Sequence, residues 1–364
     1  MKVVTIVGAR PQFIKAAPVS KELRKNHHQE ILIHTGQHYE YLMSRVFFEE
    51  LDIPEPDLNL EVGSGTHGFQ TAHMLMGVEE VLQSEKPDWV IVYGDANSTL
   101  AGALAAVKLN VPLAHVEAGL RSFNREMPEE RNRVIVDHCS DLFFCPTKTA
   151  IKHLAREGIS QEVHLVGDTM YDSVLSFGDV ARQSSKILEK LALKPGSYLL
   201  ATVHRAYNTD SPEALCSILT AFSEIKETIV FPIHPRTKHS LSGLDGAPDL
   251  SQMTHVQSIK PVSYLDMLML EQNARVILTD SGGVQKEAYF FGVPCITLRP
   301  ETEWTETVES GWNVVVGTNQ SDIVDAVQTI KPPKARGLDF GGGKAASRIV
   351  KILARLARTP TRTK

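Results

Sequence analysis

A glycine turn between an apolar run and a helical pattern carries the most specific chemical signal in this sequence. The apolar residues 276–278 lead into a turn where Ser281, Gly282 and Gly283 open a segment with helical periodicity. A helix that begins there presents unpaired backbone N–H groups and the positive end of its dipole to an anion. Glu287, almost two helical turns further on, is placed to reach the hydroxyls of a ribose attached to that anion. An ordinary strand-to-helix turn, with glycines for close packing, would have the same sequence pattern. The other motifs of the chain therefore decide whether this turn binds an anion.

Charged side chains follow three apolar runs of the first half of the chain, where the fold itself does not need them. Arg10 and Lys15 come after the first run, and the acids Asp95, Glu117 and Glu129 come after later ones. Loops at the carboxyl ends of strands in an α/β sheet converge on the ligand crevice, so we expect these side chains to share one site. A lone cation is often solvated, and a lone acid is often a helix cap. The combination of cations for an anionic leaving group with carboxylates that can move protons favours lyase or isomerase chemistry.

Two histidine-containing elements close apolar runs of the second half. They are His204, which is followed by Arg205, and His234, which lies two residues before Arg236. Neither element has the spacing of a metal-binding motif, and no HExxH or carboxylate run occurs, so we expect no metal. The turn after the first strand, Gly8–Gln12, is not a GxGxxG fingerprint, so we also expect no nicotinamide or flavin cofactor.

Short apolar runs alternate with longer helical patterns along almost the whole chain, which is typical of doubly wound α/β layers. A chain of 364 residues is too long for one typical core, so we expect two Rossmann-like domains with a cleft between them. The strands predicted for the first sheet are 3–7, 31–35, 89–93, 113–116, 142–145 and 163–166. Those predicted for the second are 198–203, 228–233, 255–259, 276–279 and 295–298.

The overall composition limits which partners the protein can have and indicates the cell compartment in which it works. A net charge of −5 argues against nucleic acid or an anionic membrane surface as the main partner. No apolar stretch approaches the roughly 20 residues that span a bilayer, and the first residues run directly into a strand pattern without the architecture of a signal peptide. The four cysteines are scattered, which favours reduced thiols and a cytoplasmic enzyme.

Taken together, the motifs resemble those of the non-hydrolysing UDP-N-acetylglucosamine 2-epimerases. The resemblance extends from Lys2 to about Leu356. The motifs that carry it are Gly8–Lys15 (Gly-Ala-Arg-Pro-Gln-Phe-Ile-Lys), Gly94-Asp95, His115–Arg121 (His-Val-Glu-Ala-Gly-Leu-Arg), Pro128–Glu130, His204-Arg205 and Asp280–Gly283.

The resemblance implies the GT-B fold and a homodimer. It assigns residues 1–172 to a first domain on the sugar and acid/base side and residues 173–345 to a second domain that binds UDP. Residues 346–364 would form a last helix that returns to the first domain, with a frayed tail.

The resemblance also implies a reaction, in which UDP-GlcNAc and UDP-ManNAc interconvert through anti-elimination of UDP and its re-addition to a 2-acetamidoglucal. Asp95, Glu117 and Glu129 are then the acid/base positions, and His204 assists departure of UDP. The remaining binding positions are Arg10, Lys15, Arg133, His234, Arg236, Ser281, Gly282, Gly283, Glu287 and the RxxTE element Arg299, Thr302 and Glu303.

Three departures from the family pattern bear on the substrate and on regulation. Tyr207 stands where members usually have an acid, and Trp304 follows Thr302-Glu303 where the plain epimerases commonly have arginine. The Thr-Glu-Trp form is similar to that of the branch acting on UDP-2,3-diacetamido-2,3-dideoxy-glucuronate, in which Arg299 and Arg236 would meet the C6 carboxylate. Gln37–Glu40 only partly matches the element of members that bind a second, activating UDP-GlcNAc. A hydrolysing epimerase, a GT-B glycosyltransferase and a sugar-nucleotide sensor stay open as alternatives.

Overall fold

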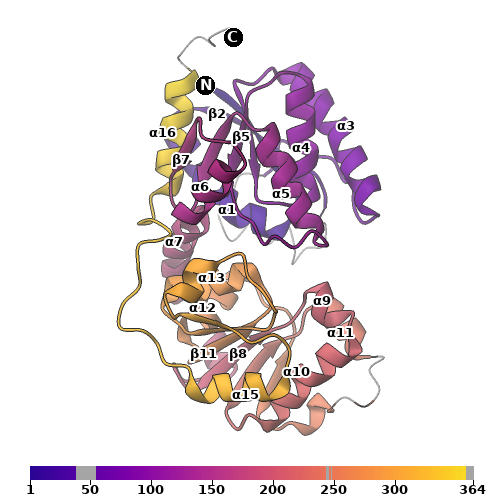
Figure 1. Cartoon of the computed structure of the whole chain (residues 1–364), viewed down its shortest axis with the longest axis vertical. Helices are drawn as coiled ribbons and strands as arrows, with labels where there is room; N and C mark the ends of the chain where they lie inside the picture. Colours follow the sequence, from indigo (N-terminus) through magenta and orange to yellow (C-terminus); the bar gives the residue numbers. More distant parts are fainter. Residues whose placement is uncertain (38–54, 243–245, 247, 358–364) are drawn as a thin grey trace. The chain divides into compact units, whose positions relative to one another are not determined.

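The computed structural model describes residues 1–37, 55–242, 246 and 248–357 (Figure 1). The Gln37–Glu40 element lies outside this range after its first residue, and so does the tail that begins at residue 358. The chain forms two compact units, one of Met1–Leu175 with Leu338–Lys364 and one of Ser176–Gly337. The chain passes from the first unit to the second within helix α7 (Thr169–Ser184).

The described part of the first unit contains a seven-stranded parallel sheet in the order β3-β2-β1-β4-β5-β6-β7. The chain adds β2 and β3 on one side of β1 and then places β4 on the other side. The carboxyl ends of β1 and β4 therefore flank the point where the strand order reverses, which is where such sheets bind ligands. The strands are β1 (Lys2–Val7), β2 (Gln29–His34), β3 (Leu58–Asn59), β4 (Trp89–Tyr93), β5 (Leu113–Val116), β6 (Leu142–Cys145) and β7 (Val163–Leu165).

Helices connect these strands, and a helix from the end of the chain joins them. The connecting helices are α1 (Arg10–Lys25), α3 (His67–Glu85), α4 (Asn97–Lys108), α5 (Pro128–Cys139) and α6 (Lys148–Arg156). Helix α16 (Ala345–Ala357), yellow in Figure 1, packs against α1. The carboxylate of Asp172 accepts hydrogen bonds from the first backbone N–H groups of α16, those of Ala345 and Ala346, at 3.1 and 2.8 Å.

The second unit repeats this plan around a six-stranded parallel sheet, β10-β9-β8-β11-β12-β13, in its described residues. Here the strand order reverses between β8 and β11. The strands are β8 (Tyr198–Thr202), β9 (Thr228–Pro232), β10 (Val256–Ile259), β11 (Val276–Thr279), β12 (Cys295–Thr297) and β13 (Asn313–Val315). The helices are α8 (Ile187–Lys190), α9 (Ala206–Thr209), α10 (Pro212–Glu224), α11 (Pro235–Leu241), η2 (Leu250–Gln252), α12 (Tyr264–Asn273), α13 (Gly282–Phe291), α14 (Thr305–Glu309) and α15 (Gln320–Thr329).

Strand β8 shows why the apolar runs are continuous. Its residues Leu199 and Ala201 belong to one hydrophobic cluster, whereas Tyr198 and Leu200 belong to another. Alternate residues of a strand point to opposite faces of the sheet, so both faces are buried and neither can be polar. The structure confirms the predicted fold class of two doubly wound α/β domains.

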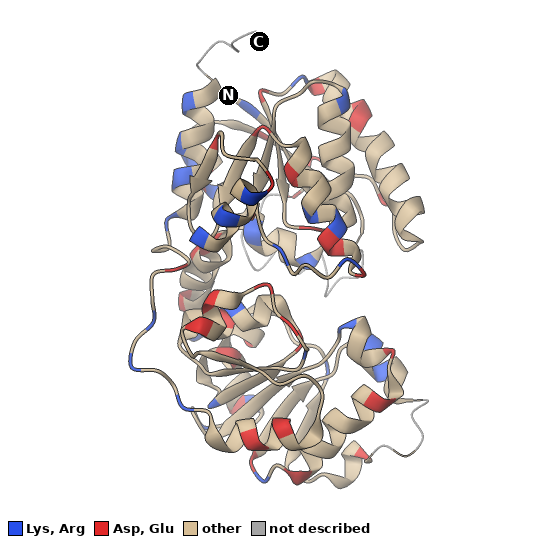
Figure 2. Cartoon of the chain, in the orientation of Figure 1, with Lys and Arg blue, Asp and Glu red and all other residues tan. Residues whose placement is uncertain are grey.

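Charged side chains of both signs are spread over both units, and basic residues recur along α16 (Figure 2). An anionic ligand must therefore be held by groups in its immediate neighbourhood. Among the described helices, none has both the length and the apolar composition needed to cross a bilayer.

Candidate active site

A buried ion pair lies at the carboxyl ends of β1, β4 and β5 in the first unit. Lys15, on α1, contacts the carboxylate of Glu117 through its Nζ atom, and the two side chains are 9% and 5% exposed. Glu117 follows β5 directly and has a φ of 72°, a left-handed conformation that is uncommon for a residue with a side chain. A Cβ atom at Gly94 would lie 3.2 Å from both charged groups, so the loop after β4 packs directly against the Lys15–Glu117 pair.

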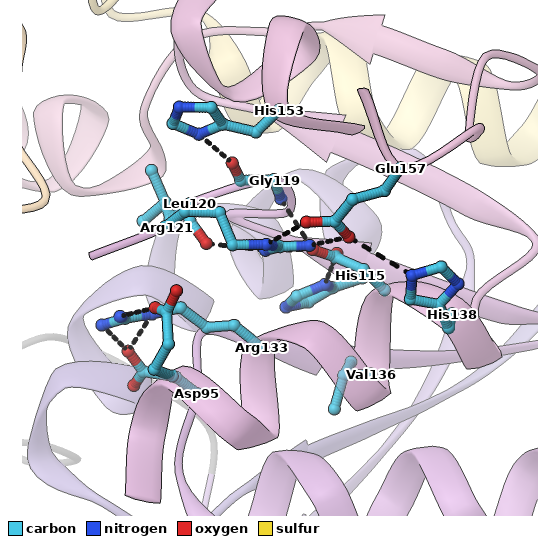
Figure 3. Close-up of polar contacts among 12 residues, drawn as sticks. Asp95, His115, Gly119, Leu120, Arg121, Arg133, Val136, His138, His153 and Glu157 are labelled. Carbon is cyan, nitrogen blue, oxygen red and sulfur yellow. Dashed lines mark hydrogen bonds and ion pairs between the residues drawn. The ribbon is translucent and has the colours of Figure 1, made fainter. Parts of the chain in front are cut away.

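Asp95 lies in the same unit and is held by Arg133 of α5 (Figure 3). The guanidinium donates from Nε and Nη2 to Asp95 Oδ2, at 2.9 and 2.5 Å, and from Nη1 to Glu130 Oε2 at 2.9 Å. The Asp95 side chain is 29% exposed, so one side of the carboxylate is open to a ligand. Arg133 therefore orients an acid in this structure, and the nucleotide contact predicted for it stays a prediction.

Arg10 and Glu129, like Asp95, are partly exposed candidates of the first unit. Arg10 begins α1, and Glu129 lies in the first turn of α5 directly after Pro128. Both side chains are partly exposed. An acid in the first turn of a helix is favoured by the dipole, so the position of Glu129 alone does not require a catalytic role.

Gln12 fixes the turn that carries Arg10. Its Oε1 atom accepts hydrogen bonds from the backbone N–H groups of Gly8 and Ala9 at 2.8 and 2.9 Å, and its Nε2 atom donates to Tyr93 O at 3.0 Å. Gln12 thereby joins the turn after β1 to the last residue of β4. No role for Gln12 was predicted from the sequence, although this residue belongs to the Gly8–Lys15 motif; it is 2% exposed.

In the second unit, Asp280 organises the loop that carries His204. Its fully buried carboxylate accepts hydrogen bonds from the backbone N–H groups of His204 and Arg205, at 3.0 and 2.9 Å, and from Asn208 Nδ2 at 3.0 Å. The ring centroids of His204 and His234 lie 5.3 Å apart. Asp280 thus holds this loop in place, a role that the sequence did not predict.

Arg236 lies two residues after His234 in the sequence, and its charge is paired with that of Asp210. The guanidinium donates to Asp210, at 2.8 Å for the shorter contact, and both side chains are about half exposed. His234 caps α11 by accepting from Arg236 N at 3.2 Å. The contact of Arg236 with a substrate carboxylate stays a prediction.

Helix α13 begins at the predicted glycine turn, and its use as an anion site stays a prediction. Ser281 is the N-cap and accepts a hydrogen bond from Val284 N at 3.4 Å. A Cβ atom at Gly282 would lie 2.4 Å from the Glu303 carboxylate, so this acid lies beside the first turn of the helix. Glu303 in turn accepts from Arg299 Nη2 at 3.2 Å.

Glu287 and Thr302 belong to the same part of the second unit. Glu287 is buried and accepts a hydrogen bond from the hydroxyl of Tyr264 at 2.9 Å. Thr302 donates to Gln285 Oε1 at 2.6 Å. Trp304 is 3% exposed, and its ring lies 4.0 Å from the Nζ atom of Lys286, a distance at which a cation is attracted to an aromatic face.

The predicted residues therefore divide into two groups, one in each unit. The described residues contain no group of three histidine, cysteine or carboxylate side chains arranged to hold a metal ion. The first group comprises Arg10, Lys15, Asp95, Glu117, Glu129 and Arg133, and the second comprises His204, His234, Arg236, Ser281, Gly282, Gly283, Glu287, Arg299, Thr302 and Glu303.

Comparisons with known proteins identify the family of this chain. The family model described as UDP-N-acetylglucosamine 2-epimerase matches residues 21–354. A protein of Methanococcus maripaludis named UDP-N-acetylglucosamine 2-epimerase homolog is 54% identical over 98% of this chain and 100% of its own length. The UDP-2,3-diacetamido-2,3-dideoxy-D-glucuronate 2-epimerase of Pseudomonas aeruginosa is 50% identical, with 98% and 100% covered.

Solved structures support the same relationship. The UDP-GlcNAc 2-epimerase of Methanocaldococcus jannaschii, in complex with UDP-GlcNAc and UDP, has a TM-score of 0.92 and 46% sequence identity. The match covers 98% of this chain and 100% of that one, and the two-domain α/β architecture is GT-B-like. Because the family model and the relatives cover almost the whole chain, this protein belongs to the UDP-N-acetylglucosamine 2-epimerase family of enzymes.

Proposed function

We propose that the enzyme interconverts UDP-GlcNAc and UDP-ManNAc at C2 without net hydrolysis of the UDP-sugar. The observation that carries this proposal is the placement of two cation-paired acids at the strand reversal of the first sheet. Lys15 contacts Glu117, and Arg133 contacts Asp95. A C2 epimerase needs more than one carboxyl group, because the proton leaves one face of the sugar and returns to the other.

The proposed mechanism is an elimination followed by an addition. A carboxylate takes the C2 proton, the C1–O bond breaks, and its electron pair leaves with UDP to give a 2-acetamidoglucal. UDP then adds back at C1 while a carboxylic acid returns a proton to the opposite face of C2. Asp95, Glu117 and Glu129 supply the acid and base groups, and which of them fills each role is left open.

Departure of UDP places negative charge on the diphosphate, so preorganised donors and cations accelerate this step. We assign this role to the N-terminus of α13 at Ser281–Gly283, to His204 and to the cations Arg10 and Lys15. Glu287 is assigned to the ribose. The buried Asp280 supports His204, since it holds the backbone N–H groups of the loop that carries this imidazole.

A second substrate has specific support. The relative from Pseudomonas aeruginosa, named for the diacetamido-glucuronate, is almost as similar as the one from Methanococcus maripaludis. Arg299 Nη1 is buried and has no hydrogen-bond partner among the described residues, so a C6 carboxylate would satisfy it. A charge-assisted contact of this kind is worth roughly 1.5–3 kcal/mol, about a tenfold to hundredfold preference.

UDP-GlcNAc is the default substrate because the family model and most of the relatives described above bear its name. The ratio of kcat/KM for the two UDP-sugars, measured on one preparation, decides between them. A uronate preference above about a hundredfold would replace the default. The resemblance also supports a cytoplasmic homodimer that serves polysaccharide biosynthesis, which light scattering and cell fractionation can test in part.

The proposed reaction is expected to exchange the C2 hydrogen with solvent. Incubation with UDP-GlcNAc in deuterated water should give UDP-ManNAc and UDP-GlcNAc that both carry deuterium at C2, observed by proton NMR. Epimer formation with no deuterium at C2 would exclude the elimination mechanism. Accumulation of free sugar and UDP would indicate a hydrolysing epimerase, and transfer only to an added acceptor would indicate a glycosyltransferase.

Ser281→Ala is expected to weaken UDP binding about tenfold to hundredfold while lowering kcat much less, because a hydroxyl donor to a charged phosphate is worth roughly 1.5–3 kcal/mol. Calorimetric titration with UDP measures the effect. The matched control is Ser211→Ala, which removes the same kind of N-cap from α10 in the same unit. Both variants should lose about 1 kcal/mol of stability from the lost cap, and equal UDP affinity in the two variants would remove Ser281 from the binding site.

A further inference from the structure

One buried face of α5 contacts both loops that carry the proposed acids. Glu130, Arg133 and Asp137 are spaced by three and four residues, so they lie on the same side of the helix, and all three are buried. Arg133 holds Asp95, as described above. Glu130 Oε1 and Oε2 accept hydrogen bonds from the backbone N–H groups of Phe123 and Ser122, each at 2.9 Å.

Asp137 is joined to the loop before Asp95 by a fully buried histidine of β5. His115 Nδ1 lies 2.7 Å from Asp137 Oδ1, and His115 Nε2 lies 2.8 Å from the carbonyl oxygen of Gly94. A carbonyl oxygen can only accept, so His115 Nε2 donates to Gly94, and the other ring nitrogen faces the Asp137 carboxylate.

The second oxygen of Asp137 contacts the loop after Glu117. Asp137 Oδ2 accepts from Gly119 N at 3.1 Å and from Arg121 Nη1 at 2.7 Å. Burial acts to raise the pKa of Asp137, but the facing His115 and Arg121 outweigh it and hold the pKa below its ordinary value. The Asp137 carboxylate therefore joins His115 to Gly119 and Arg121.

Arg121 connects this pair to α6. Its Nε and Nη2 atoms donate to the two carboxylate oxygens of Glu157, each at 2.7 Å, and Glu157 also lies 3.3 Å from His138 Nε2 (Figure 3). His153, on α6, contacts Gly119 O at 3.0 Å through Nδ1. A Cβ atom at Gly119 would lie 2.4 Å from Ala150 O, so the backbone of this loop is packed directly on α6.

These contacts fix two short segments of backbone relative to each other. His115 holds the carbonyl of Gly94, the residue before Asp95, and Asp137 holds the N–H of Gly119, two residues after Glu117. Glu117 itself has the left-handed φ of 72°. A residue in that conformation persists only when its surroundings fix it, and the His115–Asp137 pair holds the backbone just before Asp95 and just after Glu117.

We propose that His115 and Asp137 are positioning residues, which set the separation of the Asp95 and Glu117 carboxylates through Gly94 and Gly119. This role rests on the proposed function of those acids as proton-transfer groups. His115 and Asp137 themselves do not meet the substrate. They hold the two acids at the distance that removal and return of a proton at one carbon requires, and a misplacement of about 1 Å in such a site lowers the rate about 10²-fold.

The test is the pair of variants His115→Phe and His115→Gln. Phe keeps an aromatic ring and removes both ring nitrogens, so kcat for C2 epimerisation should fall about 10- to 100-fold. Gln keeps one N–H donor group, so the His115→Gln variant should recover part of this loss. Its kcat should fall by more than twofold, but by about tenfold or less. KM for UDP-GlcNAc and the Kd of UDP should stay within about twofold in both variants.

The control is His255→Gln, which changes a partly buried histidine that contacts Phe222 O at 2.8 Å in the second unit. It should lower the melting temperature by an amount similar to His115→Gln and leave kcat unchanged. If His115 had a merely structural role, His115→Gln and His255→Gln would have the same small effect on kcat.

The outcomes separate the two proposals. Absence of C2 exchange in the wild-type enzyme would overturn the proposed function. An active wild type, together with a folded His115→Gln variant whose kcat is within twofold of normal, would overturn the positioning role alone. If His115→Phe does not fold, His115→Gln decides by itself. The positioning role would also be overturned if the fall in kcat of a His115 variant were matched by an equal rise in KM or in the Kd of UDP.

Discussion

Glu117→Gln and Asp95→Asn are each expected to lower kcat for C2 epimerisation by about 10²–10⁴. Each substitution keeps the size of the side chain and an oxygen that can accept a hydrogen bond from the neighbouring cation, Lys15 or Arg133. The amide cannot take up or release the C2 proton, so proton transfer is lost while the loop keeps its shape. Glu129→Gln should act in the same way if this partly exposed acid completes the set.

The measurement is kcat under saturating UDP-sugar, together with the Kd of UDP, which should change little. Glu85→Gln is the matched control, because Glu85 also pairs with a lysine of the first unit, at 2.7 Å, but its side chain is 37% exposed. This control should keep full activity. Near-normal kcat in all three carboxamide variants would reassign Asp95, Glu117 and Glu129 to structural roles.

Four of the interior strands could be predicted from the sequence to the residue, and the predicted limits of the others differ by one or two residues. Apolar runs at 89–93, 113–116, 142–145 and 276–279 are the strands β4, β5, β6 and β11 with the same limits. These strands lie inside their sheets and are buried on both faces, so each reads in the sequence as a mostly apolar run between turn signals.

The strands at two sheet edges could not be predicted in this way. The edge strand β3 is the pair Leu58–Asn59, with both residues exposed, and β13 (Asn313–Val315) has only three residues. An edge strand of two or three residues, such as β3 or β13, is too short for its composition to give a reliable signal. Its existence depends on the strand beside it, which a local pattern does not report.

For the site, the sequence indicated which loops meet but not which side chains pair. Lys15 and Glu117 are 102 residues apart, and their contact follows from β1 and β5 flanking β4 in the sheet. For the same reason the buried supports Gln12, Asp137 and Asp280 had no predicted role. A buried carboxylate looks like a surface acid in the sequence until the strand order shows what surrounds it.

Lys15→Met is expected to destabilise the first unit by about 3–5 kcal/mol, the typical cost of removing one member of a buried ion pair. Lys15 and Glu117 are 9% and 5% exposed, so the Glu117 carboxylate would lose a charged partner in a place that water reaches poorly. Urea unfolding measures the loss. Lys2→Met is the control, because the Lys2–Glu85 pair is 28% and 37% exposed and should contribute about 1 kcal/mol or less.

The double variant Lys15→Met/Glu117→Gln should recover most of that stability, because neither buried charge then remains. The coupling energy of the double-mutant cycle isolates the pair from the other contacts of each residue. Recovery of stability should bring no recovery of kcat, since the double variant lacks the Glu117 carboxylate that moves the proton. If the two substitutions were additive in stability, the pair would contribute nothing to the fold, and Lys15 would be retained for the departing UDP alone.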